Sequence, residues 1–282
     1  MVPTDTTLTK RQAVDFLALD QKVFDNYFQF ASEFNCLERQ GGRGRFYFSQ
    51  VALEEWKASY TWRTVELTLD DYSLCLDFAL AMHIRGYVLS DWGTARQREF
   101  GQKITNWIRG QLAEVAVKKF FENEFGITVE LDFRIYDEIV PQDIIGVLDS
   151  GTVRPPRTGV GIKSSKPKSA YLVLGENEIV RTERMSDYYI LCRPDIPDDH
   201  LLRLTKDRII QIVSGQPHFP TYGAQIPDFE NMWCEVAGWC RRDELESVTS
   251  IPGQDFDGVR FVKKSGRLHK DRASWQELIA RL

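Results

Sequence analysis

The feature that most constrains the fold of this 282-residue chain is a change of hydrophobic period near its middle. From about Glu99 to Phe125, apolar residues recur every three or four positions, which predicts one long amphipathic helix that ends at Gly126. Short β-rich runs broken by Pro, Gly and Asp follow at 127–133, 143–147, 159–163 and 188–192. This order predicts an α+β or α/β fold in which helices flank a mixed sheet.

Composition places the chain among soluble, folded proteins. Hydrophobic residues make up 43% of it and charged residues 27%, which are ordinary values for a globular domain. No apolar run reaches the roughly 20 residues of a membrane-spanning helix, and the N-terminus does not resemble a signal peptide. We therefore expect a cytoplasmic protein that has no membrane span. The five cysteines and four histidines lack metal-ligand spacing, so a zinc site or a disulfide framework is not expected.

Positive charge is concentrated in two stretches, although the net charge is −5. Residues 154–168 contain five Lys or Arg and no acid, and residues 258–272 contain six Lys or Arg and one acid. Local basic patches of this kind attract nucleic acids even on an acidic protein. A solvated surface is the alternative for the second stretch.

The first 62 residues predict a small separate unit. Thr9 and Gln12 have capping-box spacing at the start of one helix, and Asp20 can cap a second. The glycine-rich stretch 39–45 has the composition of a hairpin tip, and Ser49 can cap a third helix after it.

This order of helix, turn, helix, hairpin and helix resembles the winged helix-turn-helix domains of the excisionase and mercury-regulator type. The resemblance implies that one helix enters the major groove of DNA while Arg43 and Arg45 of the hairpin contact phosphates. The alternative is a helical subdomain with an exposed charged turn. Residues 63–98 are then expected to form a helical connector, and residues 99–282 a larger second domain.

Three polar residues of that second domain occur in a characteristic order. Glu114 lies on the long helix, Asp143 begins a strand shortly after Pro141, and Lys163 lies on the next strand. This order resembles the PD-(D/E)XK nuclease superfamily, particularly type II restriction endonucleases, over about residues 99–195. In that family the three residues converge at a sheet edge, where the carboxylates hold Mg²⁺ and the Lys orients and helps deprotonate a water molecule.

One position departs from the family pattern. The motif places Asp or Glu two residues before its Lys, but Gly161 stands there. Glu176 and Glu178, thirteen and fifteen residues after Lys163, could supply the missing carboxylate. Alternatively, Glu114 is a sufficient second metal ligand, or the site no longer cleaves.

The residues that directly follow Lys163 are also polar. Because the end of this strand would meet the sugar-phosphate backbone, we expect DNA contacts there. A solvated loop is the alternative interpretation. The residues concerned are Ser164, Ser165, Lys166 and Lys168.

The sequence therefore predicts a Mg²⁺-dependent, type II restriction-like endonuclease that acts on double-stranded DNA. The resemblance implies a homodimer, because two active sites related by a two-fold axis cut both strands of a symmetric sequence. It also implies functional pairing with a DNA methyltransferase. The alternatives are a catalytically inactive DNA-binding protein of the same fold, and a nuclease of DNA repair or RNA processing.

Overall fold

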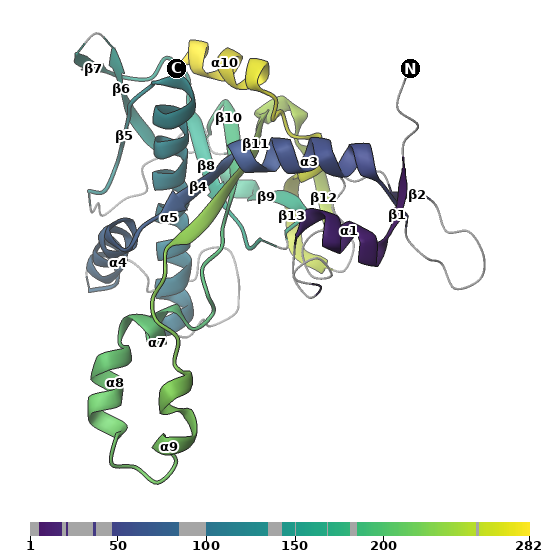
Figure 1. The fold of residues 1–282 in the computed structure, drawn as a ribbon. Coiled ribbons are helices and arrows are strands. Elements are labelled where there is room, and N and C mark those ends of the chain that lie inside the picture. The colour runs from purple at the N-terminus through teal and green to yellow at the C-terminus, as the bar shows by residue number, and fades with distance from the viewer. Residues whose placement is uncertain are drawn as a thin grey trace.

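The computed structural model describes residues 6–18, 21, 36–37, 47–84, 100–134, 143–149, 151–167, 169–180, 185–251 and 254–282. A four-stranded mixed sheet packs against one long helix, α5 (Phe100–Phe125), at the centre of the molecule (Figure 1). The strands in spatial order are β4 (Thr64–Leu67), β11 (Met232–Arg241), β10 (Tyr188–Pro194) and β8 (Val160–Ser164). Strand β8 runs parallel to β10, whereas the other neighbours are antiparallel. The predicted α+β fold with a mixed sheet is confirmed.

Helix α5 follows the predicted period closely. Ile104, Ile108 and Leu112 lie on one stripe of it and are buried. Gly126 ends the helix in the left-handed conformation, with φ 68°, and its N–H donates to the carbonyl of Glu122 at 3.1 Å. The same hydrophobic core includes, from the central sheet, Val160, Ile162, Ile190, Cys192 and Val236.

The opposite face of the central sheet is covered by a second sheet. Its strands in spatial order are β12 (Glu246–Ile251), β13 (Gln254–Lys264) and β9 (Tyr171–Gly175). Leu172 and Leu174 of β9 pack with Tyr189 and Leu191 of β10 in a second hydrophobic core. Strand β10 is therefore covered on both faces, which explains why it reads as a continuous apolar run and not as an alternating one.

The first two predicted strands of the second domain pair in a small sheet of their own. The order of this sheet is β5 (Val129–Leu131), β6 (Ile144–Asp149) and β7 (Thr152–Arg154), and all pairs are antiparallel. Asp143 directly precedes β6. The small sheet thus carries Asp143 to the side of β8.

Several helices surround these sheets. Helix α4 (Leu69–Ile84) packs on α5, and α10 (Arg272–Arg281) places Trp275 and Leu278 in the same core. Between β10 and β11, the chain makes a helical excursion that extends away from the sheets in Figure 1. It comprises the helices α7 (His200–Leu204), α8 (Lys206–Val213) and α9 (Phe219–Tyr222).

The helical excursion is attached to the body by a buried histidine. The ring nitrogens of His200 lie 2.5 Å from the hydroxyl of Tyr72 on α4 and 2.9 Å from that of Thr105 on α5. Burial, followed by the charge of Arg109, lowers the pKa of His200. The neutral ring therefore links both helices to the base of the excursion.

The N-terminal unit forms the predicted capped helices around a small core. Its elements are β1 (Thr7–Thr9), α1 (Lys10–Leu17), β2 (Cys36–Leu37), β3 (Tyr47–Ser49) and α3 (Gln50–Trp62), with the strands in the order β1-β3-β2. The capping box of Thr9 and Gln12 is confirmed, as is the Ser49 cap of α3. The second predicted helix, apart from residue 21, and the hairpin tip with Arg43 and Arg45 lie outside the described residues.

The stretch 63–98, expected as a helical connector, contributes directly to the main core. Strand β4 follows α3 after a single residue and pairs with β11, and Val65 and Leu67 are buried in the core shared with α5. The burial of alternate residues makes these four residues an edge strand of the central sheet. Helix α4 covers α5, so the described part of this stretch packs as part of the larger unit.

A buried charge network joins the end of α3 to the central sheet. One carboxylate oxygen of Glu235 on β11 lies 3.2 Å from Nη1 of Arg63, and the other lies 2.8 Å from Nη1 of Arg193 on β10. Arg63 also donates to the carbonyl of Val236 at 2.9 Å. Arg63 is only 2% exposed and Glu235 8%. The network therefore fixes residue 63, between the N-terminal unit and β4, to the centre of the sheet.

Two expectations concern the chain as a whole. In the part of the chain that the structure describes, no helix is long and apolar enough to span a membrane. The described cysteine side chains, Cys75, Cys192, Cys234 and Cys240, are free and buried. They are therefore small residues of the core.

Candidate active site beside strand β8

The three residues of the predicted nuclease pattern lie together beside β8. Glu114 projects from the middle of α5, Asp143 precedes β6, and Lys163 lies near the end of β8. Strand β8 is the edge strand of the central sheet, and Oδ2 of Asp143 accepts a hydrogen bond from the N–H of Ile162 at 2.5 Å. This contact brings the small sheet against the edge of the central sheet. Asp143 is therefore held at the backbone of the residue that directly precedes Lys163.

Glu114 is buried and Asp143 is half-buried, and the two carboxylates influence each other. Burial raises the pKa of Asp143, although the Lys163 ammonium and the Ile162 N–H oppose this rise. Burial and then the charge of Asp143 raise the pKa of Glu114 well above its usual value, and Lys163 again acts in the opposite direction. Two neighbouring carboxyl groups in a poorly hydrated place disfavour being ionised together. A cation between them would relieve this repulsion.

Lys163 forms an ion pair with the carboxylate of Glu178, with Nζ 2.6 Å from Oε2. Burial alone would lower the pKa of Lys163, but Glu178 and Asp143 raise it to about 12. The side chain is therefore an ammonium ion at neutral pH. It can orient a water molecule or neutralise a phosphate, but in this state it has no free lone pair with which to accept a proton.

Only one of the two candidate replacement acids reaches the site. Both lie on the short helix α6 (Glu176–Val180), which directly follows β9. Glu178 contacts Lys163 through Oε2, and its Oε1 accepts from the N–H of Gly175 at 3.1 Å. Glu176 is exposed at the first position of the helix. Thus Glu178, and not Glu176, lies at the predicted site.

The place of the missing motif acid is filled by neighbouring side chains. Tyr189 of β10 lies opposite Gly161 in the parallel register of the two strands. A Cβ atom at Gly161 would lie 3.1 Å from the Tyr189 ring and 3.0 Å from Oγ of Ser186. The Tyr189 hydroxyl is fixed in turn, because it accepts from the N–H of Ser186 and donates to the carbonyl of Glu178, each at 3.2 Å. A motif carboxylate at position 161 would therefore have to displace the ring.

Restoring the motif acid with Gly161→Asp is accordingly expected to destabilise the protein. Forcing atoms into a well-packed region usually costs about 1–3 kcal/mol, and we expect a loss of that size in urea denaturation. As a control, Gly215→Asp introduces the same residue where no atom lies within 4 Å of the new Cβ. That variant is expected to stay within about 0.5 kcal/mol of the wild type. Equal stability of both variants would show that the Tyr189 ring moves aside freely.

Two further polar residues, which the sequence pattern did not indicate, adjoin Glu114. Nε2 of Gln111 donates to Oε1 of Glu114 at 3.0 Å. The charge of Asp132, which follows β5, contributes to the raised pKa of Glu114, and Asp132 also pairs with Arg134 at 2.9 Å. Gln111 precedes Glu114 by three residues, so helical spacing alone places it on the same face of α5. Asp132 could be found only through the pairing of β5 with β6.

The carboxylate oxygens of the site suit a hard divalent cation that takes its remaining ligands from water and substrate. Within the described ranges, no three His, Cys, Asp or Glu side chains form a ready metal-binding group. A metal ion here would therefore have two protein carboxylates, Glu114 and Asp143, as its ligands. Mg²⁺ is usually bound in this way, by one or two carboxylates together with water and substrate phosphates. The mutually repelling carboxylate pair fits such an ion.

The predicted DNA-binding residues have different outcomes. Ser164 and Ser165 are half-buried at the end of β8, and the N–H of Ser165 donates to the carbonyl of Cys192 at 2.9 Å. Lys166 is exposed directly after them. Lys168, like Arg43 and Arg45, lies outside the described residues. Lys166 is thus the described basic residue that extends the surface next to the site.

The second basic stretch is largely engaged in contacts within the protein. Arg272 pairs with Glu124 at 2.6 Å and lies over the ring of Trp62, and Arg267 pairs with Glu246 at 3.5 Å. The alternative interpretation of this stretch, a solvated surface held by local pairs, agrees with these contacts.

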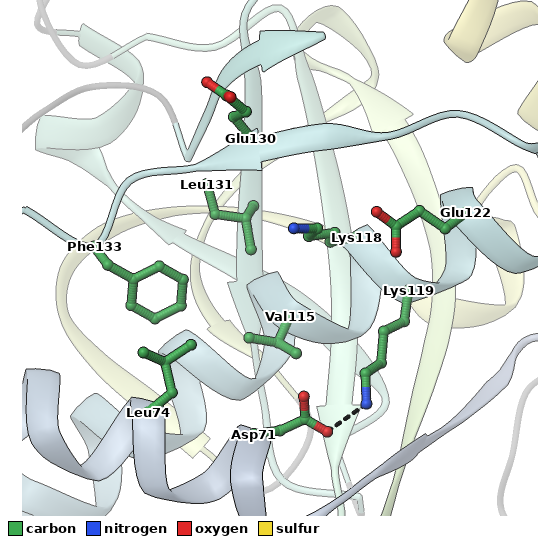
Figure 2. A pocket seen from close by; sticks show the side chains of 9 residues that line it. All are labelled: Asp71, Leu74, Val115, Lys118, Lys119, Glu122, Glu130, Leu131 and Phe133. Carbon is green, nitrogen blue, oxygen red and sulfur yellow. Dashed lines mark hydrogen bonds and ion pairs between the residues drawn. The ribbon is translucent and has the colours of Figure 1, made fainter. Parts of the chain in front are cut away.

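A cavity of about 540 Å³ adjoins the site but is separate from it. Figure 2 shows its walls, formed by α4, α5 and β5, with four apolar side chains turned toward one another and Lys119 joined to Asp71. The apolar lining consists of Leu74, Val115, Leu131 and Phe133. Glu114, Asp143 and Lys163 do not line it. The cavity therefore shares α5 with Glu114 but does not form one pocket with the carboxylate pair.

No protein-family model, curated protein or solved structure matches this chain.

Proposed function

We propose that this protein is a Mg²⁺-dependent endonuclease of the type II restriction kind, which hydrolyses phosphodiester bonds in double-stranded DNA. The observation that carries the proposal is the convergence of Glu114, Asp143 and Lys163 beside β8. These residues come from a helix, a strand start in the small sheet and a strand of the central sheet. The charge of Lys163 acts on both carboxylates, which requires all three groups to be near one another.

Each residue then has a separate part in hydrolysis. Glu114 and Asp143 would hold the ion through their carboxylates. A bound Mg²⁺ would neutralise the phosphate and lower the pKa of a coordinated water. Lys163, kept as an ammonium by Glu178, would stabilise the negative charge that develops on the phosphate in the transition state. This role of Lys163 differs from the one that the family resemblance implies, because a protonated Lys163 can orient a water molecule but cannot accept its proton.

DNA binding is assigned to the surface around the site and to the N-terminal unit. Lys166 and the hydroxyl groups of Ser164 and Ser165 would contact the sugar-phosphate backbone beyond β8. The winged-helix-like unit would supply sequence recognition in the major groove. A homodimer would place two such sites on opposite strands, and a partner methyltransferase would protect host DNA.

One observation favours a second candidate, a DNA-binding protein of the same fold that has lost catalysis. Gly161 leaves the motif without one acid, and the Tyr189 ring occupies the space where that acid would begin. Glu178, the candidate replacement for that acid, is paired with Lys163. It is therefore not one of the two inferred metal ligands, Glu114 and Asp143.

Incubation of the full chain with supercoiled plasmid and Mg²⁺ distinguishes these possibilities. We expect discrete linear fragments with Mg²⁺ and intact plasmid with EDTA. Progressive degradation to small products would favour a repair-type nuclease, and cleavage of duplex RNA in a parallel reaction would favour RNA processing. Intact plasmid that is retarded in a gel shift would contradict the nuclease and favour the inactive DNA-binding protein.

A further inference from the structure

Gln111 is a buried amide with only one of its two polar side-chain atoms hydrogen-bonded among the described residues. It lies on α5, three residues before Glu114, and is 7% exposed. Its Nε2 donates to Oε1 of Glu114 at 3.0 Å. Its Oε1 is buried and has no hydrogen-bond partner among the described residues. The amide is therefore anchored on the Glu114 carboxylate by one atom, and its other polar atom is an acceptor without a partner in the described residues.

This acceptor differs from the other unpaired polar atoms of the core. In the described part of the chain, the remaining buried side-chain atoms without a partner are all N–H groups. They belong to Arg109, Arg193, Trp239 and Trp275. Gln111 Oε1 is the acceptor of the set, and its amide is hydrogen-bonded to Glu114, one of the two carboxylates that would hold a cation. Leaving such a group unpaired costs about 1–3 kcal/mol, so a buried acceptor calls for a donor.

The chemistry of the site indicates what this donor is. The water molecules that coordinate a cation held by Glu114 and Asp143 direct their hydrogens outward. Mg²⁺ keeps several of these waters when it is bound to protein. An amide oxygen next to the carboxylates is an acceptor for them. The planar amide links the two contacts, because fixing Nε2 on Glu114 also fixes the direction of Oε1.

We propose that Gln111 is a positioning residue of the metal site. Its Nε2 holds the Glu114 carboxylate, and its Oε1 accepts a hydrogen bond from the hydration shell of the metal ion. The inference rests on the proposed function, since it requires a cation at the carboxylate pair. Partners of this kind commonly change metal affinity by about 10–100-fold when they are removed.

The test uses Mn²⁺ as the probe and the full chain in calorimetric titration. Gln111→Leu keeps the approximate size of the side chain but removes both polar contacts, and we expect Mn²⁺ affinity to fall by about 10–100-fold. Gln111→Glu keeps an acceptor oxygen and is expected to recover at least part of the affinity. Gln102→Leu is the matched control, because Gln102 is exposed on the same helix. It should bind Mn²⁺ as the wild type does.

Two further measurements separate positioning from a merely structural role and from direct coordination. Without metal, Gln111→Leu should lower the free energy of unfolding by no more than about 1–3 kcal/mol, because it removes a buried acceptor that has no partner but also takes the Nε2 donor from the Glu114 carboxylate. Broadening of the Mn²⁺ resonance in ¹⁷O-water counts the waters on the ion. This count should be unchanged in Gln111→Leu. One additional water would mean that Oε1 is a direct ligand, which would overturn the proposal.

The failures are distinguishable. Wild-type protein that does not bind Mn²⁺ would overturn the metal site, and with it the proposed function and this inference. Wild-type binding with equal affinity in Gln111→Leu would overturn the inference alone. A large loss of stability in metal-free Gln111→Leu and Gln111→Glu would assign Gln111 to the fold and likewise overturn it.

Discussion

Replacing Glu235 with Gln is expected to lower the free energy of unfolding by about 3–5 kcal/mol, the usual result of removing one partner from a buried ion pair. The substitution keeps the shape of the side chain and removes its charge. Arg63 and Arg193 would then both remain at the sheet without the carboxylate that lies 3.2 Å and 2.8 Å from them. Urea denaturation of the two proteins at neutral pH measures the difference.

The exposed pair of Glu246 and Arg267 provides a matched control. Its atoms lie 3.5 Å apart, and both side chains are more than half exposed. Glu246→Gln should therefore change the free energy of unfolding by less than about 1 kcal/mol. A similarly small change for Glu235→Gln would mean that water reaches the Arg63 and Arg193 guanidinium groups in the folded protein.

The same network makes stability depend on pH in a defined direction. Burial alone would raise the pKa of Glu235, but Arg193 and Arg63 together hold it below its usual value. The unfolded chain, with a Glu pKa of about 4.3, therefore takes up this proton more readily than the folded protein. The contribution of the network is present above that pH and is lost as the pH falls through the lower, folded pKa. The difference between wild type and Glu235→Gln should shrink accordingly below about pH 4.

Local sequence signals predicted the helices well. The hydrophobic period and Gly126 place the helix at about 99–125, and the structure has it at Phe100–Phe125. The caps at Thr9 and Ser49 likewise depend on residues within one turn of each other. These features were accessible because helix ends are determined by neighbouring side chains and backbone groups.

Strand pairing was less accessible, since it depends on residues that are distant in sequence. Strand β4 has only four residues, and its partner β11 lies more than 160 residues further along the chain, as in the pairing of Val65 with Cys234. Nothing within 63–98 indicates that partner. The sequence indicated that the runs 127–133 and 143–147 are β-rich. It did not indicate that they form their own sheet with a third strand, β7.

At the candidate site too, some features could be predicted from the sequence and others depend on the fold. The order of Glu114, Asp143 and Lys163 was visible in the sequence, and so was the absence of an acid at Gly161. The choice between Glu176 and Glu178 was not, because it depends on where the short helix α6 begins after β9. The reason why Gly161 carries no side chain lies in Tyr189, which the register of β8 with β10 places opposite it.

Asp143→Asn and Lys163→Met are expected to reduce cleavage by about 10³-fold or more, the scale on which preorganised charges at an active site contribute to the rate. Asp143→Asn replaces the carboxylate of a proposed metal ligand by a neutral group of the same shape. Lys163→Met keeps an unbranched side chain but removes the cation that would stabilise the phosphate. Single-turnover cleavage of plasmid DNA with excess protein measures the rate without a contribution from product release.

Lys166→Met is the control that separates catalysis from binding. Lys166 is exposed three residues beyond Lys163, so its removal should weaken DNA binding and its salt dependence while leaving the single-turnover rate at saturation nearly unchanged. The two site variants should show the opposite behaviour, with gel-shift affinity retained in Ca²⁺ and cleavage lost in Mg²⁺. If Lys163→Met cut DNA at the wild-type rate, the ammonium paired with Glu178 would be part of the fold and not of the reaction. The carboxylates Glu114 and Asp143 would then have to support hydrolysis without it.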